Sequence, residues 1–280
     1  MERRGFVVGA GAFAVAAAAG AAGLAGCGRS AGPGQAAKPV GRTGASAARE
    51  ISGTLDSRFT KARMGWTISM PGGARKPLAT VFCLHGYHSD HRMAFDQVDL
   101  PQVAAGLGLP LVIAAVDGGA DSYWHKRADG TDAMAMLMRE FVPLVRDRVG
   151  PLPQALLGWS MGGYGALLAA ERFTGQFHAV APASPAVWLA PGDTAPGAFD
   201  SPADFYANDV FTGVGRLRPL KVAVFCGDQD PFYVATRHLV GLMRYPHEAR
   251  FAPGGHDDTY WRSVAPGQLR AIAQARGIAR

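Results

Sequence analysis

The sequence predicts an α/β fold in which a mostly parallel β-sheet carries helices on both faces. Two observations lead to this prediction. From about residue 51 onward, short apolar runs alternate with segments of helical spacing, an order typical of strands joined by right-handed crossovers. Most of these runs are continuously apolar and do not alternate with polar residues, which indicates parallel strands that are buried on both faces.

The elements can be assigned in order along the chain. The predicted strands share a short apolar run and span 66–70, 80–84, 110–116, 155–159, 178–181, 220–226 and 248–252. The predicted helices occupy the gaps between them, at 132–149, 162–173, 234–243 and 263–276. In sheets of this kind the functional residues gather at the carboxyl ends of the strands, so the residues that follow each strand are the candidates for a site.

One segment between two predicted strands is rich in aromatic residues. It runs from 184 to 219 and is too short for a separate domain. It is long enough for a small cap over the cleft, where its aromatic side chains would shape a pocket. A packed surface excursion is the alternative, and both interpretations remain open.

Length and composition favour one globular domain with a large core. The chain has 280 residues, of which 48% are hydrophobic and 18% are charged. The formal net charge is +6, and the basic residues are scattered along the chain. Because no basic run or aromatic-basic interleaving appears, nucleic acid is not an expected partner.

The N-terminus has the features of an export signal. Arg3 and Arg4 form a twin arginine, an Ala/Gly-rich apolar run follows at 6–24, and the sequence L-A-G-C ends at Cys27. This order of parts is typical of a signal peptide, and its last part resembles a bacterial lipobox. We expect a twin-arginine lipoprotein signal over 1–27, with Cys27 lipidated and the protein held at the outer face of the cell membrane, or secreted. An uncleaved membrane anchor is the alternative.

A linker and two further cysteines can also be assigned. Residues 28–50 lack apolar periodicity and are rich in Gly, Ala and Pro, so we predict a flexible linker. The domain is then 51–280. Cys83 and Cys226 each lie in an apolar run, and we expect buried core thiols there and no disulfide.

The run L-L-G-W-S-M-G-G-Y-G contains the pattern G-x-S-x-G around Ser160. An apolar strand precedes it and a helix of small residues follows, the context of a sharp strand-to-helix turn that exposes a nucleophilic serine. Gly158 and Gly162 flank the serine where such a turn leaves no room for a Cβ atom. We therefore predict that Ser160 is a nucleophile.

A serine hydroxyl needs a base to take its proton. His256 lies in the Gly-rich loop P-G-G-H-D-D after the last predicted strand, and we predict that it is this base. The loop after the preceding strand, C-G-D-Q-D-P-F, offers Asp228 and Asp230 as the acid that orients His256. We favour Asp230, which lies three residues after Gly227, and expect Asp228 to satisfy loop amides. The order Ser, Asp, His is that of α/β-hydrolases.

Three motifs together resemble the serine esterases of the esterase D group, over about residues 65–270. They are G-W-S-M-G-G-Y-G-A-L, G-D-Q-D-P-F and G-G-H-D-D-T-Y-W. This group includes S-formylglutathione hydrolases and feruloyl-type esterases, and mycolyltransferases are related to it. The resemblance implies the α/β-hydrolase fold. One departure is that S-M-S-G of the mycolyltransferases is S-M-G-G here, which favours hydrolysis over acyl transfer.

The same resemblance implies further site residues. An H-G-x turn after the strand 80–84 would present the backbone N–H of Tyr87 to the oxyanion, with the N–H of Met161 as the second donor. Gly86 would let the backbone approach the substrate closely. The stretch D-G-G-A-D-S-Y-W resembles a part of the family near the substrate cleft. It implies that Asp117, Tyr123 and Trp124 bind substrate together with Gly86.

The stretch L-H-G-Y-H-S-D-H-R at 84–92 raises the alternative of a metal site. It places His85, His88, Asp90 and His91 within seven residues, and His and carboxylates are zinc ligands. A Ser–His–Asp mechanism needs no metal, so we expect no metal and no cofactor. His85 should brace the loop, while His88 and His91 should lie at the cleft rim or in solvent, with substrate contact as the next possibility.

These features predict an exported serine carboxylic ester hydrolase that acts through an acyl-enzyme on Ser160. We expect a monomer whose substrate is a small-molecule ester, including a lipid or sugar ester. Two alternatives remain: acyl transfer to a sugar or glycolipid acceptor, and a catalytically silent binding protein of the cell envelope.

Overall fold

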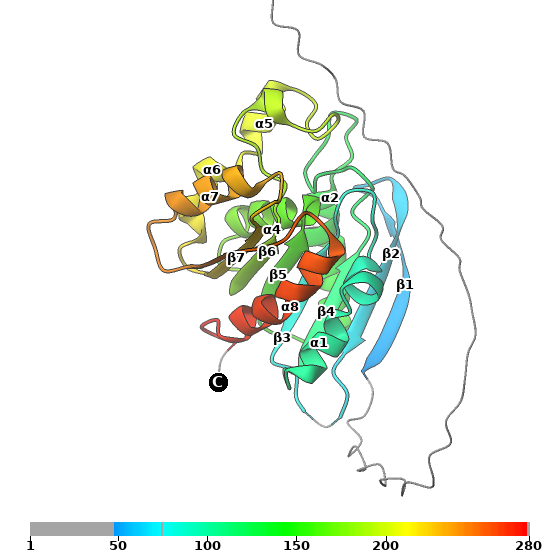
Figure 1. Cartoon of the computed structure of the whole chain (residues 1–280). Coiled ribbons are helices and arrows are strands. Elements are labelled where there is room, and N and C mark those ends of the chain that lie inside the picture. The colour runs from blue at the N-terminus through cyan, green and yellow to red at the C-terminus, as the bar shows by residue number, and fades with distance from the viewer. Residues whose placement is uncertain (1–47, 74, 279–280) are drawn as a thin grey trace, which may run out of the picture. The chain divides into compact units, whose positions relative to one another are not determined.

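The computed structural model describes residues 48–73 and 75–278, which form an eight-stranded sheet in the order β1-β2-β4-β3-β5-β6-β7-β8 (Figure 1). Pairing is antiparallel between β1 and β2 and between β2 and β4, and parallel throughout the rest of the sheet. The strands are β1 (Arg49–Ser57), β2 (Ala62–Met70), β3 (Ala79–Leu84), β4 (Leu111–Val116), β5 (Gln154–Trp159), β6 (Ala179–Ala183), β7 (Lys221–Gly227) and β8 (Glu248–Ala252).

All seven predicted strands are present, and β1 is an additional strand. β1 lies at the edge of the sheet, where Ile51 and Leu55 are only partly buried. A strand with one weakly apolar face gives little signal in the sequence. Because β1 begins at Arg49, the predicted linker boundary at residue 50 is two residues too late.

The helices follow the predicted alternation. A helical stretch over 133–149 contains one π-helical turn, Leu137–Phe141, between α2 and α3. The helix α1 was not predicted, and α8 begins five residues before the predicted start at 263. The α-helices are α1 (Leu100–Gly106), α2 (Ala133–Met136), α3 (Val142–Val149), α4 (Met161–Arg172), α5 (Pro202–Ala207), α6 (Val210–Gly213), α7 (Tyr233–Leu242) and α8 (Asp258–Ala273).

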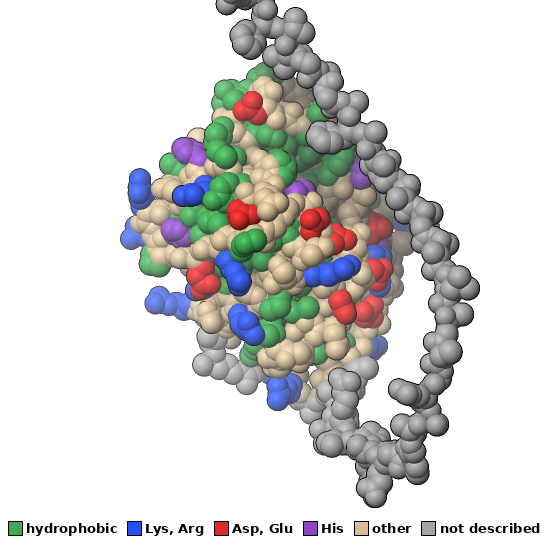
Figure 2. Space-filling view, viewed as in Figure 1, with side chains coloured by type: hydrophobic (Ala, Val, Ile, Leu, Met, Phe, Trp, Pro, Cys, Tyr) green, Lys and Arg blue, Asp and Glu red, His purple; other side chains and the backbone are tan. Residues whose placement is uncertain are grey.

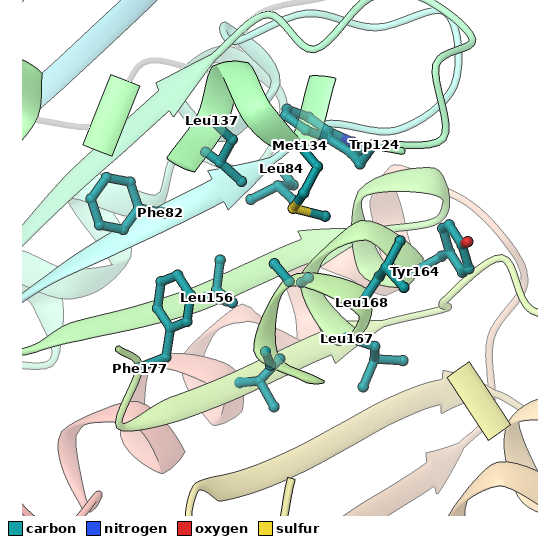
Figure 3. Packing of buried hydrophobic residues seen from close by; sticks show 14 of the residues in the cluster. Phe82, Leu84, Trp124, Met134, Leu137, Leu156, Tyr164, Leu167, Leu168 and Phe177 are labelled. Atoms are coloured by element: carbon teal, nitrogen blue, oxygen red, sulfur yellow. The ribbon is translucent and has the colours of Figure 1, made fainter. Parts of the chain in front are cut away.

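Two hydrophobic clusters cover the two faces of the sheet, as predicted. One cluster packs α1 and α8 against the sheet through residues such as Leu100 and Leu269. The other packs α2, α3 and α4 and the π-helical turn between α2 and α3 against the opposite face; Phe82 and Leu156 of the strands and Leu137 of this turn belong to it (Figure 3). The continuous apolar strands are buried because both faces are covered.

The segment between β6 and β7 contains α5 and α6 and is an excursion of the main domain. Phe199 from this segment packs against Tyr123, Tyr164 and Trp188, at ring-centroid distances of 5.9 to 6.3 Å. These contacts attach the segment to the loop after β4 and to α4. The predicted cap segment is therefore a packed layer above the carboxyl ends of the strands.

Some predictions lie outside the described residues. These are the signal peptide over 1–27, the lipidation site Cys27 and the linker up to residue 47. Within the described part of the chain, no helix has both the length and the apolar character needed to span a membrane. Cys83 and Cys226 are buried and free, as predicted.

Candidate active site

Ser160 lies at a sharp turn between β5 and α4. Its backbone angles are φ 53° and ψ −121°, a strained conformation for a residue with a side chain. A Cβ atom at Gly158 would lie 2.3 Å from the carbonyl oxygen of Gly162, and one at Gly162 would lie 1.9 Å from that of Leu84. Only glycine fits at both positions, so the G-x-S-x-G spacing is what permits this turn.

Ser160, His256 and Asp230 form one continuous hydrogen-bonded chain. The Oγ atom of Ser160 lies 2.8 Å from Nε2 of His256, and Nδ1 of His256 lies 2.9 Å from Oδ2 of Asp230. His256 comes from the loop after β8 and Asp230 from the loop after β7. The geometry allows Nδ1 to donate to the carboxylate while Nε2 accepts the serine proton.

The structure distinguishes the two candidate acids. The side chain of Asp230 is fully buried, and its Oδ1 atom accepts the N–H of Phe232 at 2.8 Å. Asp228 instead accepts the N–H of Gly254 at 3.3 Å. Asp228 therefore holds the loop that carries His256, and Asp230 is the carboxylate in contact with the imidazole.

The backbone around Gly86 lies against the serine turn. A Cβ atom at Gly86 would be 3.6 Å from Cβ of Ser160, and Gly86, Tyr87 and Ser160 line the same cavity. Among the hydrogen bonds of the described residues, none uses the backbone N–H of Tyr87 as donor. Met161 is the first residue of α4, so its N–H has no acceptor within the helix. Both N–H groups are thus available to an oxyanion.

His85 holds the loop around Gly86 in place by hydrogen bonds to Gly86 and Gly118. Its Nε2 atom accepts the N–H of Gly118 at 2.8 Å, so Nδ1 carries the proton and donates to the carbonyl oxygen of Gly86 at 2.8 Å. Burial lowers the pKa of His85, which favours the neutral ring. The predicted bracing role of His85 agrees with these contacts.

Trp124 and Asp117 support the site but do not line its cavity, which corrects the expectation that they contact substrate. Trp124 is completely buried, and its indole N–H donates to the carbonyl oxygen of His85 at 3.3 Å. Asp117 accepts the N–H groups of Gly65 and His91, each at 2.8 Å. Both residues therefore hold loops in place.

His91 pairs with Asp117 and does not converge with the other two histidines of its loop. Its Nδ1 atom lies 2.6 Å from Oδ1 of Asp117. Burial acts to raise the pKa of Asp117, but the hydrogen bonds from the His91 ring and backbone and from Gly65 outweigh it, so this pKa lies below its ordinary value. Within the described residues, the possible metal-ligand group consists of Asp90, His91 and Asp117.

A cavity of about 790 Å³ opens over Ser160 and His256. Of the residues predicted to bind substrate, Gly86 and Tyr123 line it, and His88 lies at its wall. The cavity also has apolar lining residues that the sequence analysis missed, namely Met93, Ala195, Pro196, Phe232 and Trp261. Phe232 and Trp261 could have been suspected, because each lies within five residues of a triad member.

Burial affects one tyrosine of this wall. Tyr123 is almost fully buried, and this burial raises the pKa of Tyr123 to about 12. The phenol is therefore neutral at ordinary pH and can act as a hydrogen-bond donor. It places an uncharged hydroxyl-bearing ring in the cavity.

Comparison with known proteins identifies the family of the chain. A family model described as "Putative esterase" matches residues 57–272. The chain belongs to this esterase family and has an α/β-hydrolase fold, so the predicted resemblance to esterases of the esterase D group is confirmed. A search of curated proteins found no match.

Solved structures show the same fold at low sequence identity. A ferulic acid esterase is 21% identical with a TM-score of 0.69, covering 81% of this chain and 98% of its own. An S-formylglutathione hydrolase from Agrobacterium tumefaciens is 17% identical with a TM-score of 0.69, covering 84% and 98%. FphF, a fluorophosphonate-binding serine hydrolase of Staphylococcus aureus, is 19% identical with a TM-score of 0.66, covering 81% and 99%.

Proposed function

We propose that this esterase hydrolyses carboxylic esters through an acyl-enzyme on Ser160. The observation that carries the proposal is the unbroken chain from Ser160 through His256 to Asp230, with contacts of 2.8 and 2.9 Å. A serine held at a strained turn, beside an imidazole and a buried carboxylate, is an arrangement for nucleophilic catalysis.

The mechanism follows from the positions of these groups. His256 takes the proton of Ser160 as Oγ attacks the ester carbonyl, and the N–H groups of Tyr87 and Met161 stabilise the oxyanion. His256 then gives the proton to the leaving alcohol. A water molecule that His256 deprotonates then attacks the acyl-enzyme. As the bond from the acyl carbon to Oγ breaks and the acid leaves, His256 returns this proton to Oγ of Ser160. Throughout, Asp230 keeps the proton of the imidazole on Nδ1 and stabilises the imidazolium without taking the proton itself.

The proposed location is the outer face of the cell membrane. Its support is in the sequence alone: the twin arginine, the apolar run and the L-A-G-C motif that ends at Cys27. Lipidation of Cys27 would tether the domain through the residues before β1. Metabolic labelling with a radioactive fatty acid tests this, because Cys27→Ala should abolish incorporation. Labelling that persists in this variant would contradict the anchor.

The catalytic proposal is tested with Ser160→Ala and an activated short-chain aryl ester. The variant keeps the turn but lacks the nucleophile, so hydrolysis should fall by roughly 10³-fold or more, to a background that binding and the oxyanion hole supply. Ser263→Ala, at an exposed serine of α8 that does not line the cavity, is the matched control and should keep the wild-type activity. A Ser160→Ala protein that retains its kcat would overturn the mechanism.

A further inference from the structure

A second hollow adjoins the active-site cavity near the start of α7. It has a volume of about 470 Å³, and Ala195 and Phe232 line both this hollow and the cavity over Ser160. We call it the apolar groove. Its other apolar lining residues are Val187, Trp188, Leu189, Pro231, Val234 and Ala235.

The wall between the two spaces is aromatic. Trp188 of the groove packs edge-on against Phe232 with 5.3 Å between ring centroids, and Phe232 packs against His256 at 5.2 Å. Trp188 also lies 5.6 Å from Tyr123 of the cavity. The groove therefore lies next to the catalytic centre, on the other side of the Phe232 ring from His256.

Two large side chains of the groove face solvent. Leu189 is 53% exposed and Val234 is 69% exposed. Among the described residues that line the groove, Asp193 is the one with a charged side chain, and it is exposed. In the space-filling view, hydrophobic side chains gather in the upper part of the face, over the segments around α5 to α7 (Figure 2). Apolar surface that continues an active site commonly binds part of the substrate.

Part of the lining of the catalytic cavity is polar. Ser89, Asp90, Gln97 and Asp258 line it, so it offers hydroxyl, amide and carboxylate groups. An ester consists of an acyl group and an alcohol. A hydroxyl-bearing alcohol can form hydrogen bonds with the polar groups of the cavity, and this leaves the apolar groove for the acyl chain.

We propose that the apolar groove binds the distal part of the acyl chain and makes the enzyme selective for medium- and long-chain acyl esters. This inference rests on the proposed ester hydrolysis and adds the substrate class. Each methylene that is buried should raise kcat/KM by about threefold to fourfold, which is the effect of its transfer free energy. The rise should continue until the chain extends beyond Val234 into solvent.

The experiment compares two series of esters. In the first, p-nitrophenyl esters run from acetate to decanoate, below their micelle concentrations. In the second, acetate esters of linear alcohols run from ethanol to decanol. The readout is the ratio of kcat/KM for the longest chain to that for the shortest. We expect this ratio to exceed roughly 100 in the acyl series and to remain within about tenfold in the alcohol series.

Substitutions in the groove test whether it is the source of the selectivity for acyl-chain length. Val234→Asp introduces a charge at an exposed position in the first turn of α7, where an acidic residue is compatible with the helix. This variant and Leu189→Asp should each lower the acyl-series ratio by about tenfold or more. Leu242→Asp, at the other end of α7 and 37% exposed, is the matched control and should keep the wild-type ratio.

The outcomes separate the two proposals. A flat acyl series with normal hydrolysis of acetate would overturn the acyl-chain inference and leave the proposed function intact. A rise in the alcohol series alone, or an equal loss in Leu242→Asp, would also overturn the inference. Absence of hydrolysis for every ester would refute the proposed function itself.

Discussion

The replacement Asp230→Asn tests how the triad works. In the structure, Oδ1 of Asp230 accepts the N–H of Phe232 at 2.8 Å, and Oδ2 faces Nδ1 of His256 at 2.9 Å. The amide oxygen of Asn would keep the contact to Phe232, which turns the amide NH₂ group toward His256. Nδ1 must then be unprotonated, so the proton moves to Nε2. A protonated Nε2 cannot accept the proton of Ser160.

The magnitude follows from this change of tautomer. In Ser–His–Asp enzymes the equivalent replacement lowers kcat by about 10⁴-fold while the geometry is kept. A loss of 10³ to 10⁴ corresponds to about 4 to 5.5 kcal/mol of transition-state stabilisation. The assay is steady-state hydrolysis of an activated aryl ester, with circular dichroism to show that Asp230→Asn is folded. KM should change much less than kcat.

Asp228→Asn is the matched control from the same loop. Its side chain accepts the N–H of Gly254 at 3.3 Å, and an Asn oxygen can accept the same hydrogen bond. We expect kcat within about threefold of the wild type. Asp230 would not be the residue that orients His256 if Asp230→Asn retained a tenth of the activity, or if Asp228→Asn lost as much activity as Asp230→Asn.

Two further predictions concern the turn and a buried acid. Gly162→Ala should lower the stability by at least about 3 kcal/mol and remove most of the activity, because its Cβ would lie 1.9 Å from the carbonyl oxygen of Leu84. Gly241→Ala in α7 is the control: a Cβ there meets nothing within 4 Å, so thermal melts should show no destabilisation. Burial, and then repulsion from Asp209, raise the pKa of Glu171 to about 9. The folded state therefore keeps a proton that the unfolded chain releases above pH 4.5, and wild-type stability should fall as the pH rises from 4.5 to 9. Glu171→Gln removes this dependence, so the free energy of unfolding of the variant minus that of the wild type should grow by on the order of 1.4 kcal/mol per pH unit in that range. A difference that stays constant with pH would contradict this prediction.

The sequence predicted best the features for which the structure allows only certain residue types. Parallel strands covered on both faces must be continuously apolar, so β3 to β7 were visible in the sequence. The turn at Ser160 demands glycine on both sides, so Gly158 and Gly162 marked it. The edge strand β1 gave no comparable pattern, because half of its side chains face solvent.

The site residues beyond the triad were harder to predict. Asp117 and Trp124 follow a strand end, where substrate contacts are common, yet both are used to hold loops. Their position along the chain does not reveal which way a side chain points. Conversely, Ala195 and Pro196 reach the cavity from the segment between β6 and β7, and only the packing of that segment brings them there.

The activation of Ser160 as a nucleophile can be measured directly with a fluorophosphonate probe, followed by intact mass and peptide mapping. We predict one adduct per chain, located on Ser160, which is absent in Ser160→Ala and forms much more slowly in His256→Ala. Ester hydrolysis should disappear in proportion to labelling. An adduct on another residue, or continued hydrolysis by a chain that the probe does not label, would show that Ser160 is not the nucleophile.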